Sequence, residues 1–376
     1  MTKSTARKLM LVGDLILDEP EPDSFFNLAR NTLQEADLLV GHVEVPHTRR
    51  GSETTSDVPA PPSNPENLAA LKHAGFHVAT LAGNHMFDAG PNGIEDTMAT
   101  LRLLGIATTG AGMHLAESRE PAVVVCQGLR VGVLSYNCVG PKDSWADEKK
   151  AGCAYVQVIT HYELDHATPG GPPRIYTFSE PESTDAMLAD IVNLRREVDI
   201  VVVALHKGIG HTPAVLAMYE RPLAKAAIDA GADIVVGHHA HILRGVEVYK
   251  NRPIYHGLGN FVTVTRALNI DNNPSPKRLE WARRRRELFG FEPDSNYPTY
   301  PFHPEARNAM IAVCEIDADG VPKAGFIPCW INPKGQPEIC IDDARGRAVA
   351  SYIEQITGKA GLGADFRWNG DWVRFL

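Results

Sequence analysis

The sequence predicts an α/β protein built on a largely parallel β-sheet that helices cover on both faces. Two observations predict this class. Short runs of aliphatic and β-branched residues without polar alternation are typical of strands that are buried on both faces. Stretches with helical periodicity separate these runs, and such alternation indicates parallel strands joined by helices. The 376 residues, 44 % of them hydrophobic and 22 % charged, are also typical of a globular protein and exclude a disordered chain.

Five apolar runs in the first two thirds of the chain are the expected strands, at residues 9–12, 36–40, 78–82, 200–205 and 232–236. The expected helices lie at residues 24–35, 64–75, 91–104, 183–197 and 214–230. The second of these helices is clearly delimited, because Asn64 and Pro65 form a polar cap with proline in the first turn, and Gly75 ends it.

Five further strands, at residues 246–249, 253–255, 261–265, 309–316 and 324–331, suggest a second and more antiparallel sheet. Residues 140–181 and 266–307 lack core periodicity, and we expect them to be insertions near the site entrance of a single domain that spans 1–376. Within the second insertion, residues 276–288 are expected to form a helix with its arginines in solvent. Residues 342–376 are expected to form a helix and a closing segment that contains Trp368 and Trp372.

Charge and cysteine content exclude several classes of protein. With 37 basic and 46 acidic residues the net charge is −9, which argues against binding to nucleic acid or to an anionic membrane surface. No apolar run is long enough to span a bilayer, and the run at 9–12 is too short for a signal peptide. The six cysteines show no CxxC motif and are expected to be core thiols of a cytoplasmic protein. A homo-oligomer is compatible with these features.

Polar residues at the strand ends are the main functional signal. Of the 15 histidines, eight lie in or just after these clusters: His42, His85, His206, His211, His238, His239, His241 and His256. Because the carboxyl ends of parallel strands open on one crevice, residues far apart in the sequence are brought together there.

The strand-end residues offer oxygen and imidazole ligands without a thiolate. The candidate metal ligands are Asp14, Glu44, Asn84, His206, His238, His239 and His241. Such a set suits Zn²⁺, Mn²⁺, Fe²⁺ or Mg²⁺. Packing these groups together without a metal would be costly, because buried carboxylates lose hydration and charged histidines repel each other. Two divalent ions about 4 Å apart, bridged by one carboxylate, would satisfy the whole set.

Each of these residues also has a structural explanation. Asp14 could stabilise a turn, Glu44 could be an exposed edge residue, and His85 could be a core histidine bonded to a carbonyl. These explanations account for single residues but not for their recurrence after successive strands. The candidate substrate-binding residues beside them, which could equally be solvated or structural, are His42, Lys207, His211, Arg244, His256 and Asn260.

Five motifs in order carry a family resemblance over residues 8–265. They are Gly13-Asp14, then Val43-Glu44-Val45-Pro46, Gly83-Asn84-His85 with Asp88, His206, and the His-His-Ala-His run at 238–241 followed by Leu258-Gly259-Asn260-Phe261. This series resembles the CapA, or poly-gamma-glutamate capsule biosynthesis, family, which is similar to the calcineurin-like metallophosphoesterases. The resemblance implies a four-layer αββα sandwich with a two-metal site.

The resemblance also implies roles for individual residues. Asp14 would bind the first metal, Asn84 and His206 the second, and Glu44 would bridge both. His85, oriented by Asp88, would protonate the leaving group or stabilise the transition state. His239 and His241 would divide between the metals, while the role of His238 stays open because relatives differ there.

The leading expectation is a metal-dependent hydrolase in which metal-activated water attacks a small anionic substrate, with a phosphoester favoured by analogy. One alternative is an amide or lactam hydrolase that uses the same site. Another is an accessory protein of poly-gamma-glutamate synthesis, and a third is a binding protein without turnover. The sequence departs from the family around three supposed ligands, at His42, Lys207 and His256, which puts the usual substrate of the family in doubt.

Overall fold

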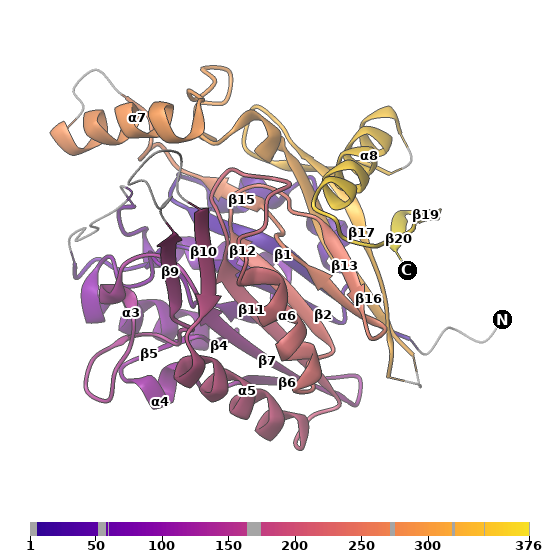
Figure 1. Cartoon of the computed structure of the whole chain (residues 1–376). Helices are drawn as coiled ribbons and strands as arrows, with labels where there is room; N and C mark the ends of the chain where they lie inside the picture. The colour runs from indigo at the N-terminus through magenta and orange to yellow at the C-terminus, as the bar shows by residue number, and fades with distance from the viewer. Residues whose placement is uncertain are drawn as a thin grey trace.

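Two β-sheets lie face to face and helices cover the outer face of each, which gives the four-layer αββα sandwich (Figure 1). The computed structural model describes residues 6–51, 58, 60–163, 174–270, 275–317, 320–341 and 343–375. The helices α5 and α6 lie in front of one sheet in Figure 1, and α7 and α8 lie at its upper edge. The fold class expected from the family resemblance is therefore confirmed.

The first sheet has ten strands in the described part of the chain, and β1 lies at its centre. The strands β1 to β4 are mutually parallel, β15 adds to β1 in parallel, and β16 pairs with β1 in the antiparallel sense. The strands are β1 (Arg7–Leu17), β2 (Leu38–Val43), β3 (Val78–Thr80), β4 (Ala107–Thr109), β15 (Asn260–Val264), β16 (Asn308–Ile316), β17 (Pro322–Ile331), β18 (Pro337–Ile339), β19 (Phe366–Asn369) and β20 (Trp372–Phe375).

The second sheet has the strand order β13-β14-β12-β11-β7-β6. Its inner strands β7, β11, β12 and β14 are parallel, and an antiparallel strand closes each edge. The strands are β6 (Ala122–Cys126), β7 (Leu129–Asn137), β11 (Ile200–Lys207), β12 (Ile234–His239), β13 (Val246–Tyr249) and β14 (Arg252–Tyr255). Two small antiparallel pairs stand apart from it: β5 (Ala111–Gly112) with β8 (Gly152–Cys153), and β9 (Val158–Glu163) with β10 (Arg174–Ser179).

The α-helices range from the four residues of α1 to the 16 residues of α8. The α-helices are α1 (Arg30–Leu33), α2 (Ala69–Ala74), α3 (Gly90–Leu103), α4 (Leu115–Ser118), α5 (Pro181–Arg195), α6 (Glu220–Asp229), α7 (Pro276–Phe289) and α8 (Ala344–Lys359). The 3₁₀ turns are η1 (Pro22–Phe26), η2 (Pro65–Leu68), η3 (Lys142–Ser144) and η4 (Pro304–Arg307). The side chain of Asp343 caps α8 and that of Glu180 caps α5, so that exposed backbone N–H groups are satisfied.

Strand alternation assigns each side chain to one of three apolar cores. In β1, Leu9 and Leu11 face the core between the sheets, whereas Met10 and Val12 face α2 and α3. In β11, Val202 faces the inter-sheet core and Val203 faces the layer of α5 and α6. The continuous apolar runs of the sequence are explained by these strands, because both of their faces are buried. This alternation also decides which strand-end residues reach the crevice.

All ten predicted strands are present, but their grouping into sheets was predicted wrongly. The early strands are divided between the two sheets, and the later strands extend both of them instead of forming an antiparallel sheet of their own. Periodicity does not specify which strands pair. The strands β6 and β7, which begin the second sheet, were not predicted, and neither was the β9–β10 hairpin within residues 140–181.

Three predicted helices differ from the structure in detail. The helix expected at 24–35 is η1 followed by the single turn α1, in a stretch that contains Asp23, Ser24 and Asn27, residue types of low helix propensity. The helix expected at 214–230 begins only at Glu220, because Arg244 binds the carbonyl of Val215 in the preceding loop. The helix at 276–288 is present as α7, although Arg285 is buried instead of solvated.

All six cysteines are buried free thiols, as expected. No helix in the described ranges combines the length and apolar character needed to cross a membrane.

Candidate metal centre

A buried cluster of carboxylates and imidazoles lies at the carboxyl ends of β1, β2 and β11. Asp14, His42, Glu44 and His206 each place one potential ligand atom within 4.8 Å of those of the others. All four side chains are at most 1 % exposed. The cluster joins both sheets, since β1 and β2 belong to the first sheet and β11 to the second.

Local backbone geometry fixes this cluster. His42 and Glu44 are two residues apart at the end of β2, so their side chains lie on one face. Asp14 is held by a backbone hydrogen bond from its N–H to the carbonyl of Gly259, at 2.9 Å. That approach requires glycine before Asp14, because a Cβ on Gly13 would lie 2.0 Å from the Gly259 oxygen.

The surrounding residues form two groups that Glu44 joins. In the first, Asp14 Oδ1 is 3.1 Å from His238 Nδ1 and Oδ2 is 3.2 Å from His241 Nδ1. In the second, Asn84 Oδ1 is 2.9 Å from His206 Nε2. Glu44 Oε1 lies 3.6 Å from His206 Nε2 and 3.9 Å from His241 Nε2, so one carboxylate faces both groups.

His239 and His241 have unusual backbone conformations. Their φ angles are 83° and 54°, in the left-handed region that residues other than glycine rarely adopt. The strand register pairs His238 with His206 and His239 with Lys207, so regular alternation would turn His239 away from the crevice. Instead its ring centroid lies 5.0 Å from that of His206. The strained turn thus brings all three histidines of the run to the same site.

Several buried polar atoms of the cluster have no hydrogen bond within the described ranges. They are Asp14 Oδ2, His42 Nε2, both carboxylate oxygens of Glu44, His206 Nδ1 and His239 Nδ1. An uncompensated buried charge costs a protein about 3–5 kcal/mol. Divalent cations bind to carboxylate oxygens and neutral imidazole nitrogens, so this donor set fits such ions.

The pKa shifts of both carboxylates and of His206 and His239 favour the protonation state that binds metal, whereas the pKa of His241 is raised, because its contact with Asp14 outweighs its burial. Burial opposes ionisation of Asp14, but hydrogen bonds from His238 and His241 outweigh it and hold the pKa of Asp14 well below its usual range. Burial likewise opposes ionisation of Glu44, yet its pKa is lowered, chiefly by His206. Burial lowers the pKa of His206 and lowers that of His239 to about 4. Ionised carboxylates beside neutral imidazoles are the forms that ligate metals.

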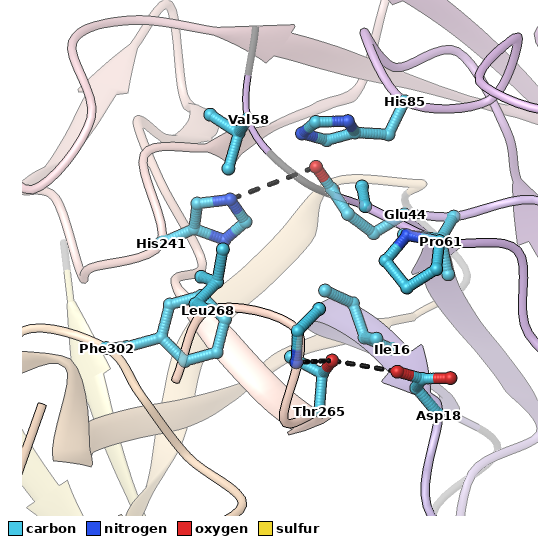
Figure 2. A pocket seen from close by; sticks show the side chains of 13 residues that line it. Ile16, Asp18, Glu44, Val58, Pro61, His85, His241, Thr265, Leu268 and Phe302 are labelled. Atoms are coloured by element: carbon cyan, nitrogen blue, oxygen red, sulfur yellow. Dashed lines mark hydrogen bonds and ion pairs between the residues drawn. The ribbon is translucent and has the colours of Figure 1, made fainter. Parts of the chain in front are cut away.

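His85 and Asp88 form a separate pair at the edge of the cluster. His85 Nδ1 donates to Asp88 Oδ2 over 2.6 Å, and both side chains are buried. This bond fixes the ring, as in other carboxylate–histidine pairs. Figure 2 shows His85 above the carboxylate of Glu44 in the pocket that both residues line.

The pocket beside Glu44 is narrow and mostly apolar. Its volume is about 40 Å³, and its walls come from β1, from the segments after β2 and β15, and from Phe302. The dashed line in Figure 2 marks the contact between His241 and Glu44 at one end of the pocket, and Phe302 lies below His241. The Phe302 ring centroid is 5.2 Å from that of His241, so this aromatic side chain packs directly on a candidate ligand.

Segment 266–307 contributes most of the outer contacts of the site. Tyr300 accepts a hydrogen bond from Asn260 Nδ2 at 3.1 Å, while Asn260 Oδ1 lies 2.9 Å from His241 Nδ1. His211 was predicted to bind substrate and lies among aromatic side chains of this segment, 5.0 Å from both the Phe289 and the Phe291 rings. In the other predicted insertion, Gly140 lies directly against Asn84.

Three predicted substrate-binding residues lie in a buried ion network behind β11. Lys207 Nζ is 2.9 Å from Glu220 Oε2, and Arg244 Nη2 is 3.2 Å from Glu220 Oε1. His256 Nε2 is 3.4 Å from Glu247 Oε2. None of the three lines the pocket beside Glu44. Lys207 follows His206 directly on β11, so its side chain points to the opposite face of the sheet. These contacts favour a structural role instead of the predicted contact with substrate.

The structure also changes the expectation for His42 and adds residues that were not predicted. His42 is fully buried between the rings of His206 and His238, at 4.6 and 4.7 Å, and belongs to the metal-compatible cluster. Its spacing of two residues from Glu44 was the available sequence signal. Asp18 and Phe302 line the pocket but lie outside the motifs, so no comparable signal marked them.

The fold and site define an α/β sandwich protein with a candidate metal centre where its two sheets meet. Residues 8–265 match the family model "Bacterial capsule synthesis protein PGA_cap". The chain belongs to this family, as its motifs indicated.

Two curated relatives illustrate the family. The chain is 29 % identical over 263 residues to the PGA biosynthesis protein CapA of Bacillus subtilis, covering 67 % of this chain and 62 % of that protein. It is 31 % identical over 197 residues to the capsule biosynthesis protein CapA of Bacillus anthracis, covering 52 % and 42 %. The matches therefore span less than two thirds of the length of these relatives.

Similar solved structures are more distant. A hypothetical protein from Thermus thermophilus aligns with a TM-score of 0.45 and 14 % identity over 85 % of this chain and 97 % of that one. A calcineurin-like phosphoesterase from Bacillus subtilis aligns with a TM-score of 0.36 and 13 % identity, over 94 % and 97 %.

Proposed function

We propose that the protein is a metal-dependent hydrolase that uses two divalent ions to cleave a small anionic substrate, with a phosphoester as the preferred bond. The observation that carries this proposal is Glu44, whose buried Oε1 lies 3.6 Å from His206 Nε2 and 3.9 Å from His241 Nε2, and whose Oε2 lies 3.2 Å from His42 Nε2. A carboxylate in this position suits a bridge between two ions.

The two groups of side chains suggest how the ions would be shared. Asp14, His238 and His241 would hold one ion, and Asn84, His206 and His239 the other, with His42 beside Glu44. When bound, such ions supply Lewis acidity and make water nucleophilic near neutral pH. Asn260 Oδ1 accepts a hydrogen bond from His241 Nδ1–H, which leaves Nε2 of His241 directed towards Glu44.

His85 would move a proton during cleavage. Asp88 accepts a hydrogen bond from Nδ1–H of His85, so Nε2 is the ring nitrogen that would act as the proton donor. When water adds to the phosphorus and the ester P–O bond breaks, a proton on Nε2 passes to the leaving oxygen, and the products are an alcohol and phosphate. Proton transfer of this kind contributes about 10²–10⁴-fold to a rate.

Metal content and hydrolysis test the proposal together. We expect about two divalent ions per chain by mass spectrometry, and hydrolysis of p-nitrophenyl phosphate or bis-p-nitrophenyl phosphate. His85→Asn is expected to keep the ions and lose hydrolysis, whereas His161→Asn, on the exposed face of β9, should retain both. Hydrolysis of γ-glutamyl p-nitroanilide alone would favour the amide or lactam alternative, and absence of bound ions would overturn the proposal.

The names of the relatives favour a second candidate, an accessory role in the synthesis of a polyglutamate capsule. This role would not require free hydrolysis. In cells that carry the gene and make such a polymer, its deletion should abolish polymer production, and the His85→Asn variant should restore production fully. Restoration by the wild type alone would instead tie the role to chemistry at this site.

A further inference from the structure

The pocket that contains Glu44 and His85 ends in a carboxylate that takes no part in the metal cluster. Asp18 lines this pocket together with Ile16, and both follow Asp14 along the same stretch of chain. Figure 2 shows Asp18 and Thr265 at the opposite end of the pocket from Glu44 and His85.

The contacts of Asp18 hold its carboxylate at the pocket wall. Thr265 Oγ1 donates to Asp18 Oδ2 over 2.9 Å, and the backbone N–H of Asp18 donates to the Val264 carbonyl over 3.1 Å. Both partners belong to the end of β15 and the residue after it, so the first sheet fixes this carboxylate. The neighbouring charges are Glu19, which forms an ion pair with Arg266 at 3.1 Å, and Arg278 of α7.

The chemical character of the pocket is unusual for a site that accepts only anions. Between the two ends, the wall is apolar and includes Val45, Ala60, Pro61, Leu268 and Phe302. None of the described residues that line it is a lysine or an arginine. An anionic group can be bound at the metal end, but a second anion at the far end would meet the Asp18 carboxylate in apolar surroundings, which is unfavourable.

We infer that Asp18 is a specificity-determining residue that binds a primary ammonium group at the end of the substrate remote from the scissile bond. The inference rests on the proposed function. It assigns the substrate to a narrower class, namely phosphate esters that carry an alkylammonium group on a short apolar chain. The phosphate would lie at the metal end, the methylene groups along the apolar wall, and the ammonium at Asp18.

Three ligands of equal length test this specificity. They are 3-aminopropyl phosphate, 4-phosphonooxybutanoate and butyl phosphate, which carry a terminal cation, anion or methyl group on the same three methylene groups. Binding to the metal-loaded protein is measured by isothermal titration calorimetry, and turnover by release of inorganic phosphate.

We expect the wild type to bind the ammonium ligand about tenfold more tightly than butyl phosphate, and to bind the carboxylate ligand most weakly. Asp18→Asn keeps the shape of the side chain and should remove the preference, while metal content stays unchanged. Glu19→Gln is the matched control, because it removes a neighbouring carboxylate that does not line this pocket. This control should keep the preference.

The two measurements separate the inference from the proposed function. A binding preference that is lost in Asp18→Asn, without any release of phosphate, would support the inference and contradict the hydrolase. Equal binding of the three ligands by the wild type, an unchanged preference in Asp18→Asn, or no binding of any ligand would each overturn the inference, whether or not other esters are hydrolysed.

Discussion

The metal cluster and the segment at 266–307 are built in different ways. The cluster residues lie at strand ends, where backbone pairing and close glycine contacts fix them. The outer segment is held mainly by side chains, because Arg285 of α7 donates to the Leu268 carbonyl at 3.0 Å and pairs with Glu292 at 2.9 Å. Changes in the cluster should therefore affect metal binding, whereas changes in the segment should affect the pocket wall.

The largest effect is expected at Glu44. In metal-loaded protein, Glu44→Gln should remove about one ion per chain and lower the melting temperature, because bound metal stabilises the folded state. In metal-free protein the same change should lower the melting temperature less, because only the contacts of the carboxylate with His42 and His206 are lost. Calorimetry with and without a chelator measures both effects. A melting temperature that falls equally in both conditions would contradict the bridging role.

His85→Asn should lower kcat by about 10²–10⁴-fold, since it removes the proposed proton donor. Asp88→Asn should have a smaller effect of about 10–100-fold, because it loosens the orientation of the His85 ring. Metal content should stay at the wild-type value in both variants. A loss of metal in His85→Asn would make this residue a ligand instead of a proton donor.

Arg285→Leu tests the segment without touching the cluster. Loss of its hydrogen bonds should destabilise the fold by about 1–3 kcal/mol in urea unfolding and raise KM about tenfold through a displaced Leu268 wall. The kcat value and the metal content should change little. Arg284→Leu, at an exposed position of the same helix, is the control. A fall in metal content in Arg285→Leu would remove the distinction between the two regions.

The smallest effect concerns Asp18 and pH. Burial raises the pKa of Asp18 from 3.8 to about 6, and the neighbouring Glu19 adds to this. A carboxyl with a raised pKa in the folded state favours folding most below pH 4, and this contribution is lost as the pH rises through 6. Asp18→Asn should therefore gain stability relative to the wild type between pH 4 and 7, by about 1–2 kcal/mol. Urea unfolding of the wild type and of Asp18→Asn at pH 4 and at pH 7 measures this difference in the free energy of unfolding.

The sequence allowed prediction of ten strands and of most cluster residues, because both depend on local pattern. The apolar run before Gly13-Asp14 and the His-His-Ala-His run after β12 each place polar groups at a strand end. The pairing of strands could not be predicted, since β1 pairs with β16 almost 300 residues later. The direction of Lys207 and the burial of Arg285 also depend on tertiary partners, in particular Glu220 and Glu292.

The hydrogen bond between His238 and Asp14 closes a loop across a sequence separation of 224 residues. Such long-range contacts form slowly, because the chain loses much entropy before they form. During synthesis, residues 14 and 44 leave the ribosome long before their histidine partners exist. The nascent chain therefore displays isolated carboxylates, and the proposed ion site is complete only after both sheets have been synthesised and have docked.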